Sequence, residues 1–280
     1  MPVTFQLRPS ETRGAANHGW LKTLHTFSFA SYHEPAFEDF GCLRVLNEDR
    51  VEAGQGFPPH SHAEANIFSY VVSGTLAHKD SMGNVEAMGR GDVQMTFGGT
   101  GIRHSEYNGA DDPNGAPVHF LQVWAYPTTR GLKPQYFHRH FADTDKEDKW
   151  AHIVAPVSYP GVTNAREGTG PTPIASDLHC FASLLSPGTT IKHDVVARNS
   201  GDKDKGKLVY AQVVQTTGYN PRKAPSDGSV AQVTLALGGQ TATLAEGDGV
   251  FIRGASVGDE LVTHNVGRKV AEVVLFEMDA

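Results

Sequence analysis

The chain has 280 residues and a formal net charge of −7 at pH 7. This acidic balance argues against direct binding of nucleic acid, because proteins that bind the phosphate backbone present a basic face. Thirty glycines, sixteen prolines and many short runs rich in Val, Phe, Thr and Tyr favour an all-β protein, and the length favours two domains.

Short strands and turns are expected throughout the first half of the chain. The pattern predicts strands at residues 24–30, 41–47, 67–73, 75–79, 92–97 and 119–126. Glycine-containing segments at residues 73–74, 81–84 and 89–92 predict tight turns between them. Strands of this length and spacing are typical of an antiparallel barrel or sandwich.

The composition changes in the middle of the chain. Residues 143–149 are mostly charged, and residues 161–173 are crowded with Gly, Pro, Thr and Asn. We expect a helical or irregular connection here. The chain is therefore divided into a domain at residues 1–142, a linker region at 143–176 and a second domain at 177–280.

The second half repeats the strand pattern of the first. It predicts strands at residues 178–185, 189–196, 208–215, 229–237, 240–244, 249–252 and 270–277. Residues 244–251 are similar to residues 87–94, since a Gly-Asp turn leads into a strand in both, which suggests an internal duplication. The corresponding segments of the second copy, 187–193 and 257–260, lack paired ligands, so we expect a barrel without a metal site there.

Two residue pairs share the same spacing: His60-Ser61-His62 and His104-Ser105-Glu106. Residues i and i+2 of a strand point to the same side, so two neighbouring strands would bring all four side chains to one place. Three imidazoles and one carboxylate suit Fe(II), Mn, Ni, Cu or Zn better than Ca or Mg. The sequence therefore predicts a metal site, with one or two positions of a six-coordinate ion left open for chemistry.

Other histidines and both cysteines have simpler explanations. The chain has fourteen histidines, and a second such pair, His138 and His140, lies among charged residues, where we expect a solvated face. Cys42 and Cys180 lie in apolar stretches of different halves and are expected to be buried thiols, which fits a reducing compartment.

No stretch of the sequence looks like a targeting or membrane segment. The N-terminal residues contain no apolar run of signal-peptide length, and no run later in the chain reaches 18 apolar residues. We expect a soluble protein of the cytoplasm, the nucleus or both, which is not secreted and has no membrane partner.

Eight segments of the first half carry a family resemblance, and together they cover nearly all of residues 14–137: residues 19–21, 25–30, 40–49, 56–62, 70–74, 78–81, 91–94 and 98–106. In these segments the chain resembles the pirin family of the cupin superfamily. Pirins are bicupins, so the resemblance implies two antiparallel, jelly-roll-like β-barrels in tandem. It also implies one metal ion, usually iron, in the N-terminal barrel, with ligands falling on His60, His62, His104 and Glu106.

The chain departs from the pirin pattern at one position beside these ligands. Pirins carry a glutamate four residues after the second histidine, where this chain has Asn66, and Glu64 is out of register by two residues. That glutamate is not generally counted as a ligand, so metal binding is expected to persist with a changed polarity. Asn66 either hydrogen-bonds a ligand histidine or a bound water, or is satisfied by the backbone.

Pirin-like and other cupin proteins include quercetin 2,3-dioxygenases, which open a flavonol ring and release carbon monoxide. The resemblance therefore implies an Fe(II) dioxygenase acting on a small aromatic substrate and O₂, with Mn, Ni, Cu and Zn as alternative metals. Glu106 is expected to accept a substrate proton as well as bind the ion. The aromatic candidates for the pocket wall also fit an ordinary barrel core; they are Phe57, Phe68, Phe97, Phe120 and Trp124.

Two other functions keep the same four ligands. Some pirins are iron-dependent, redox-sensing transcriptional co-regulators, which implies a transcription factor as the protein partner. A further hypothesis is that the metal only stabilises the barrel. The sequence decides neither the metal nor the natural substrate, and a monomer is the default for a chain with two barrels.

Overall fold

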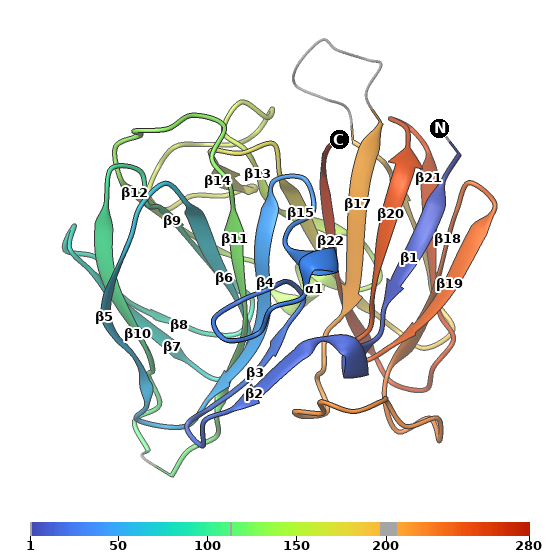
Figure 1. Cartoon of the computed structure of the whole chain (residues 1–280), viewed down its shortest axis with the longest axis horizontal. Coiled ribbons are helices and arrows are strands. Elements are labelled where there is room, and N and C mark those ends of the chain that lie inside the picture. The colour runs from blue at the N-terminus through green and yellow to red at the C-terminus, as the bar shows by residue number, and fades with distance from the viewer. Residues whose placement is uncertain (1, 113, 197–205) are drawn as a thin grey trace. The chain divides into compact units, whose positions relative to one another are not determined.

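The structure is a computed structural model that describes residues 2–112, 114–196 and 206–280. It consists almost entirely of antiparallel β-strands (Figure 1). Helical structure in the described residues is limited to α1 (Asp143–Lys146) and two 3-10 turns, η1 (Ser10–Thr12) and η2 (Pro35–Phe37). No helix in this part of the chain is long and apolar enough to cross a membrane.

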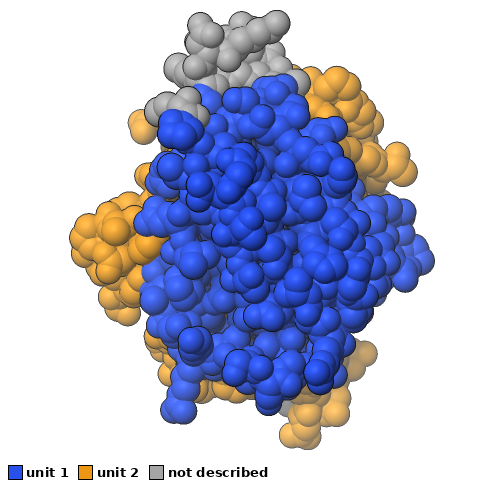
Figure 2. Space-filling model, turned by 90° about the vertical axis from the view of Figure 1, so that its right-hand side faces the viewer, with its two compact units in different colours: residues 1–13, 143–154, 178–280 blue, residues 14–142, 155–177 orange. Residues whose placement is uncertain are grey.

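The chain folds into two compact units, which are coloured separately in Figure 2. Unit 1 contains residues 1–13, 143–154 and 178–280, and unit 2 contains residues 14–142 and 155–177. The first residues belong with the last because β1 (Thr4–Arg8) pairs with β20 (Gly249–Ala255). The division expected from the sequence, into residues 1–142, 143–176 and 177–280, does not match these units. The expected linker at 143–176 carries α1 and two strands.

Unit 2 is built from two antiparallel sheets. The large sheet has the strand order β12-β9-β6-β11-β4-β3-β2, and the small sheet has the order β5-β10-β7-β8. The strands of this unit are β2 (Gly14–Asn17), β3 (Leu21–His25), β4 (Leu43–Val51), β5 (Gly56–His62), β6 (Asn66–Ser73), β7 (Leu76–Asp80), β8 (Val85–Met88), β9 (Asp92–Phe97), β10 (Ile102–Asn108), β11 (Val118–Ala125) and β12 (Gln135–His140).

Unit 1 repeats this plan with a second pair of sheets. One has the order β1-β20-β17-β22-β15-β13-β14 and the other β16-β21-β18-β19. The remaining strands are β13 (Ala151–Pro156), β15 (His179–Leu185), β16 (Thr190–Asp194), β17 (Lys207–Val213), β18 (Gln232–Leu237), β19 (Gln240–Ala245), β21 (Glu260–Asn265) and β22 (Ala271–Asp279). The residues of β14 (Thr172–Ile174), the last strand of the first of these sheets, and the last two residues of β13 belong to unit 2. The series β20-β17-β22-β15-β13 corresponds in order to β9-β6-β11-β4-β3, as a duplicated barrel requires. The predicted all-β fold of two antiparallel barrels is confirmed.

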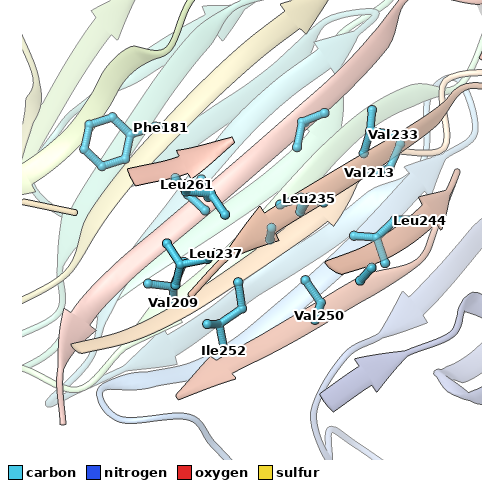
Figure 3. Close-up of a cluster of buried hydrophobic side chains, with 14 of the residues drawn as sticks. Phe181, Val209, Val213, Val233, Leu235, Leu237, Leu244, Val250, Ile252 and Leu261 are labelled. Atoms are coloured by element: carbon cyan, nitrogen blue, oxygen red, sulfur yellow. The ribbon is translucent and has the colours of Figure 1, made fainter. Parts of the chain in front are cut away.

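Each barrel has its own apolar core, because alternate residues of its strands point inward. In unit 1, strands β17, β18 and β20 contribute Val209, Val213, Val233, Leu235, Leu237, Val250 and Ile252, which gather between the sheets in Figure 3. In unit 2, one core cluster consists of Leu21, Val51, Val71, Leu76, Met88, Val118 and Phe120. The unit 2 cluster includes residues of β4 and β11, which also carry polar side chains that line the candidate site.

Candidate metal centre

Three histidines of the small sheet of unit 2 converge. His60 and His62 lie on β5, and His104 lies on β10 directly opposite His60. Nε2 of His104 is 3.1 Å from Nε2 of His60, and the three ring centroids are 4.6 to 4.9 Å apart. The i, i+2 spacing of β5 and the register of the strand pair thus bring together three of the four predicted ligands.

The tautomer of His60 is set by the backbone beside it. Its Nδ1 lies 2.8 Å from the carbonyl oxygen of Pro58, and an Nδ1–H donated to this oxygen leaves the lone pair on Nε2. This is the arrangement that metal-binding histidines use to orient the ring.

The surroundings keep two of these rings neutral. Burial, followed by the neighbouring His104 and His60, lowers the pKa of His62 to about 4, although Glu106 acts in the opposite direction. Burial, followed by His60 and His78, lowers the pKa of His104 to about 3, against an opposing effect of Asp80. Both imidazoles are therefore neutral at pH 7 and have lone pairs available for a cation.

Glu106 is buried on β10, where it groups with His104 and a histidine that we did not predict as a ligand, His78 of β7. The possible ligand atoms of these three residues lie within 4.8 Å of one another, as do those of His60, His62 and His104. His104 belongs to both groups. The structure thus offers two overlapping sets of donors and does not place all four predicted ligands in one set.

His78 has a carboxylate partner. Its Nε2 is 3.3 Å from Oδ2 of Asp80 on the same strand, while its Nδ1 is buried without a hydrogen-bond partner. Burial raises the pKa of Asp80, but hydrogen bonds from Asn84, His78 and Met82 outweigh it and hold the pKa below its usual value. The i, i+2 spacing of His78 and Asp80 is the sequence signal that could have identified this pair.

A β-bulge lies between the two predicted ligands of β10. His104 pairs with His60, but Glu106 pairs with Phe57, so the register against β5 shifts at Ser105. A bulge of this kind bends the strand and re-aims its side chains, and bulges are common beside active sites.

A cavity of about 320 Å³ opens beside the histidines. One part of its wall is apolar and aromatic, and the other carries polar groups. Its lining residues are Phe29, Asn47, Asp49, Phe57, Pro58, Pro59, His60, His62, Ile67, His104, Glu106, Gln122 and Trp124. The volume falls within the roughly 300–1,000 Å³ that is usual for small-molecule sites.

The predicted pocket residues have different positions. Phe57 lines the cavity, and Trp124 does too, with its ring 4.8 Å from that of His62. Phe97 packs against Phe137, and Phe120 belongs to the apolar core. Neither is among the residues that line the cavity, and Phe68 is likewise fully buried.

Asn66 does not reach the histidines. Its Nδ2 donates to the carbonyl oxygen of Ala175 at 3.1 Å, and its Oδ1 is buried without a partner. Of the two expectations for this residue, satisfaction by the backbone describes the observed contact.

Sequence reasoning missed the polar wall of the cavity. Asn47 and Asp49 lie on β4 and Gln122 lies on β11, and all three are at most 8% exposed. A polar residue inside an apolar strand, as in Val118–Ala125, is a weak signal by itself. Strand register shows that these polar residues lie together, because Gln122 pairs directly with Asn47.

A second histidine cluster lies in unit 1. Nε2 of His152 is 3.1 Å from Nδ1 of His179, and Nε2 of His193 is 2.5 Å from Oε1 of Glu277. The ring of Phe181 lies 4.2 Å from that of His152 and 4.5 Å from that of His193. Within the described residues, no group of three possible ligand atoms forms there.

The remaining histidine pair and the cysteines lie outside both clusters. The side chain of His140 is 58% exposed and that of His138 is 22% exposed, and both lie beside Asp92. Cys42 and Cys180 are free thiols, of which Cys180 is buried.

Comparison with known proteins identifies the family. The pirin family model matches residues 6–125. A pirin-like protein of Caulobacter vibrioides is 34% identical over 194 residues, which cover 69% of this chain and 78% of the relative. The chain belongs to the pirin family.

A curated sequence and a solved structure from Escherichia coli extend this comparison. A quercetin 2,3-dioxygenase of strain K12 is 49% identical over 135 residues, which cover 48% of this chain and 57% of the relative. The chain thus spans little more than half the length of the first curated relatives it matches. The crystal structure of the bacterial pirin YhhW in complex with nickel(II) is 32% identical with a TM-score of 0.75, and the alignment covers 99% of each chain.

Proposed function

We propose that this pirin is a metal-dependent dioxygenase that opens a flavonol such as quercetin. In this proposal His60, His62, His104 and Glu106 hold one divalent ion, Fe(II), with Mn, Ni, Cu and Zn as alternatives. The observation that carries the proposal is the convergence of three imidazoles on the wall of a cavity large enough for a small aromatic molecule.

The donor set fits such an ion. Two nitrogens bound at about 2.1 Å and at right angles stand about 3.0 Å apart, close to the 3.1 Å between Nε2 of His60 and Nε2 of His104. Neutral imidazoles and one carboxylate are the ligands that borderline divalent metals prefer. Nε2 of His60 and Nε2 of His104 can share this distance in two ways: one nitrogen donates a proton to the other, or both direct their lone pairs at a cation.

The cavity provides the groups that a polyphenol needs. Phe57 and Trp124 present apolar surface for the rings, and the polar wall of Asn47, Asp49 and Gln122 presents partners for hydroxyl groups. A bound ion would attract a hydroxyl oxygen of the substrate and lower the pKa of that hydroxyl, so that it ionises more readily. In this proposal the Glu106 carboxylate, which lines the same cavity, accepts the proton that this hydroxyl loses.

Relatives support both parts of the proposal. The K12 protein with 49% identity is named a quercetin 2,3-dioxygenase, and the structure of YhhW with 32% identity contains nickel(II). The residues matched by the pirin family model include all four proposed ligands.

The test uses the purified full chain loaded anaerobically with Fe(II), to which quercetin and O₂ are added. Ring opening inserts both atoms of one O₂ and releases one carbon monoxide, so the expected result is a 1:1 loss of flavonol and gain of carbon monoxide. His62→Ala removes a proposed ligand and should abolish both changes. His140→Ala removes an exposed histidine outside the site and should retain them.

Other outcomes would overturn the proposal. Stoichiometric metal binding through His62 with persistent flavonol would exclude this substrate and favour the iron-dependent co-regulator with a protein partner. Equal metal binding by wild type and His62→Ala would exclude the proposed ligand set itself.

A further inference from the structure

Two side chains of the large sheet hold the carboxylate of Glu106. Nε2 of Gln122 donates to Oε2 of Glu106 at 2.9 Å. The hydroxyl of Ser69 lies 3.2 Å from Oε1 of Glu106 and 3.3 Å from Oε1 of Gln122, and its proton is donated to one of them. All three residues are buried: Ser69 is 0%, Glu106 2% and Gln122 8% exposed.

These two residues belong to a polar row that crosses the large sheet of unit 2. Neighbouring members are paired directly by strand register, and each pair therefore lies on the same face of the sheet. The row runs over six adjacent strands in the order His138, Gln94, Ser69, Gln122, Asn47 and His25.

Two members of the row, Ser69 and Gln122, lie within hydrogen-bond distance of Glu106, and their neighbours in the row have other partners. Ser69 and Gln122 lie on β6 and β11, the third and fourth strands of the seven. On one side of them, Gln94 donates to Thr96 at 2.8 Å. On the other side, Nδ1 of His25 lies 2.8 Å from Oδ1 of Asn47.

Burying amide and hydroxyl groups in a barrel costs free energy unless each finds a partner. The Gln122 amide finds its partner in a carboxylate, and the Ser69 hydroxyl lies within hydrogen-bond distance of the same carboxylate. Hydrogen bonds to charged groups are the stronger kind. Each Glu106 oxygen has an interaction with one of these side chains, so about two of its four lone-pair positions stay available for other ligands.

We propose that Ser69 and Gln122 are positioning residues for Glu106: they set the orientation in which its carboxylate meets the metal. This inference rests on the proposed function, because it requires Glu106 to be a ligand. The large sheet thereby tunes a site whose ligands are all carried by the small sheet. Partners that orient a ligating carboxylate typically change metal affinity by about 10- to 100-fold when they are removed.

The test measures Ni(II) affinity by calorimetry and the Ni(II) absorption spectrum, and so does not depend on catalytic activity. Gln122→Met keeps the length of the side chain but removes the donor, and Ser69→Ala removes the hydroxyl. Each should weaken binding by about tenfold or more and shift the spectrum. Ser69→Thr keeps the hydroxyl and should restore the wild-type affinity.

Gln94→Leu is the matched control. It removes a buried amide from the neighbouring position of the same row, and the observed bond of Gln94 is to Thr96 rather than to Glu106. Its Ni(II) affinity and spectrum should match those of the wild type, whatever it does to thermal stability.

A double-mutant cycle with Glu106→Gln separates positioning from general loosening of the barrel. If Gln122 acts through Glu106, Gln122→Met should cause little further loss of affinity once Glu106→Gln is present. The inference would be overturned if Gln122→Met lowered metal affinity equally in both backgrounds. It would also be overturned if Gln122→Met and Ser69→Ala did not lower the affinity while Glu106→Gln did. Either result would leave the proposed ligand set intact. No effect of Glu106→Gln would overturn the proposed role of Glu106, and the inference with it.

Discussion

Nε2 of His60 and Nε2 of His104 lie 3.1 Å apart at directly paired positions of β5 and β10. Both nitrogens are in one unit, and the strands that carry them are held by the same small sheet. The pair is therefore built into the register of the barrel before any ligand binds.

Metal should stabilise the protein through this pair. An ion that binds only the folded state adds about 2.7 kcal/mol to the free energy of unfolding at a concentration 100 times its dissociation constant. We expect Ni(II) or Fe(II) to raise the unfolding midpoint in scanning calorimetry and EDTA to reverse the change. His104→Ala should remove the response and His140→Ala should keep it; a metal response that persists in His104→Ala would contradict the expectation.

His78 provides a test of which donor group holds the ion. Because we propose His60, His62, His104 and Glu106 as ligands, His78→Gln should change metal affinity by less than about tenfold, whereas His62→Ala should lose a ligand outright. Equilibrium dialysis with Ni(II) measures both. His119→Gln is the control, since His119 is a buried histidine whose Nε2 lies 3.1 Å from Glu48 and outside both groups. A loss for His78→Gln equal to that for His62→Ala would place the ion in the group of His78, His104 and Glu106.

The histidine cluster of unit 1 should make stability depend on pH. Burial, with a smaller effect of His193, lowers the pKa of His152 to about 4. Burial, followed by His152, Lys207 and His193, lowers the pKa of His179 to about 3. A histidine whose pKa is lower in the folded state contributes stability above its unfolded pKa of about 6.5, and this is lost as the pH falls toward the folded value.

The free energy of unfolding should therefore decrease between about pH 6.5 and pH 4, by an amount on the order of a few kcal/mol. Urea unfolding at several pH values measures the slope. The double variant His152→Gln, His179→Gln should reduce this slope, and His62 and His104, whose pKa values are also lowered, should account for part of what remains. His18→Gln, at an exposed position, should leave the slope unchanged. An unaltered slope in the double variant would show that these rings do not couple folding to pH.

Gly56 should be intolerant of any side chain. A Cβ at this position would overlap the carbonyl oxygen of Glu106 and Cα of Tyr107, both of them backbone atoms of β10. Gly56→Ala should destabilise the protein by about 1–3 kcal/mol and weaken metal binding, because the strand that carries Glu106 has to move. Thermal unfolding and calorimetric titration measure the two effects. Gly89→Ala meets no atom within 4 Å and should change neither; an equal cost at both positions would contradict the steric explanation.

The parts of the site that sequence could predict are those governed by local periodicity. The i, i+2 pairs identified His60, His62 and His104 because a strand repeats every two residues. Residues 92–97 were predicted as a strand and form β9 over the same residues. The segment predicted as a strand at 24–30 differs, since β3 ends at His25 and Ala30 has a positive φ of 51°.

The parts that could not be predicted depend on pairing between distant strands. Ser69 and Gln122 are 53 residues apart, and only the register of β6 against β11 places them side by side beneath Glu106. The assignment of Phe57 to the cavity and of Phe97 to the core likewise depends on which sheet each faces. A hydrophobic pattern contains no information of this kind.

The pairing of β1 with β20 has a consequence for synthesis of the chain. Once β1 has been made, its partner β20 follows only after roughly 240 further residues, which takes about 12–50 s at 5–20 residues per second. The N-terminal segment is then anchored by hydrogen bonds from Ser10 to Asp248 and from Arg13 to Gly247. Deleting residues 4–13 would therefore damage unit 1 and leave the sequence of unit 2, which carries the candidate metal centre, intact.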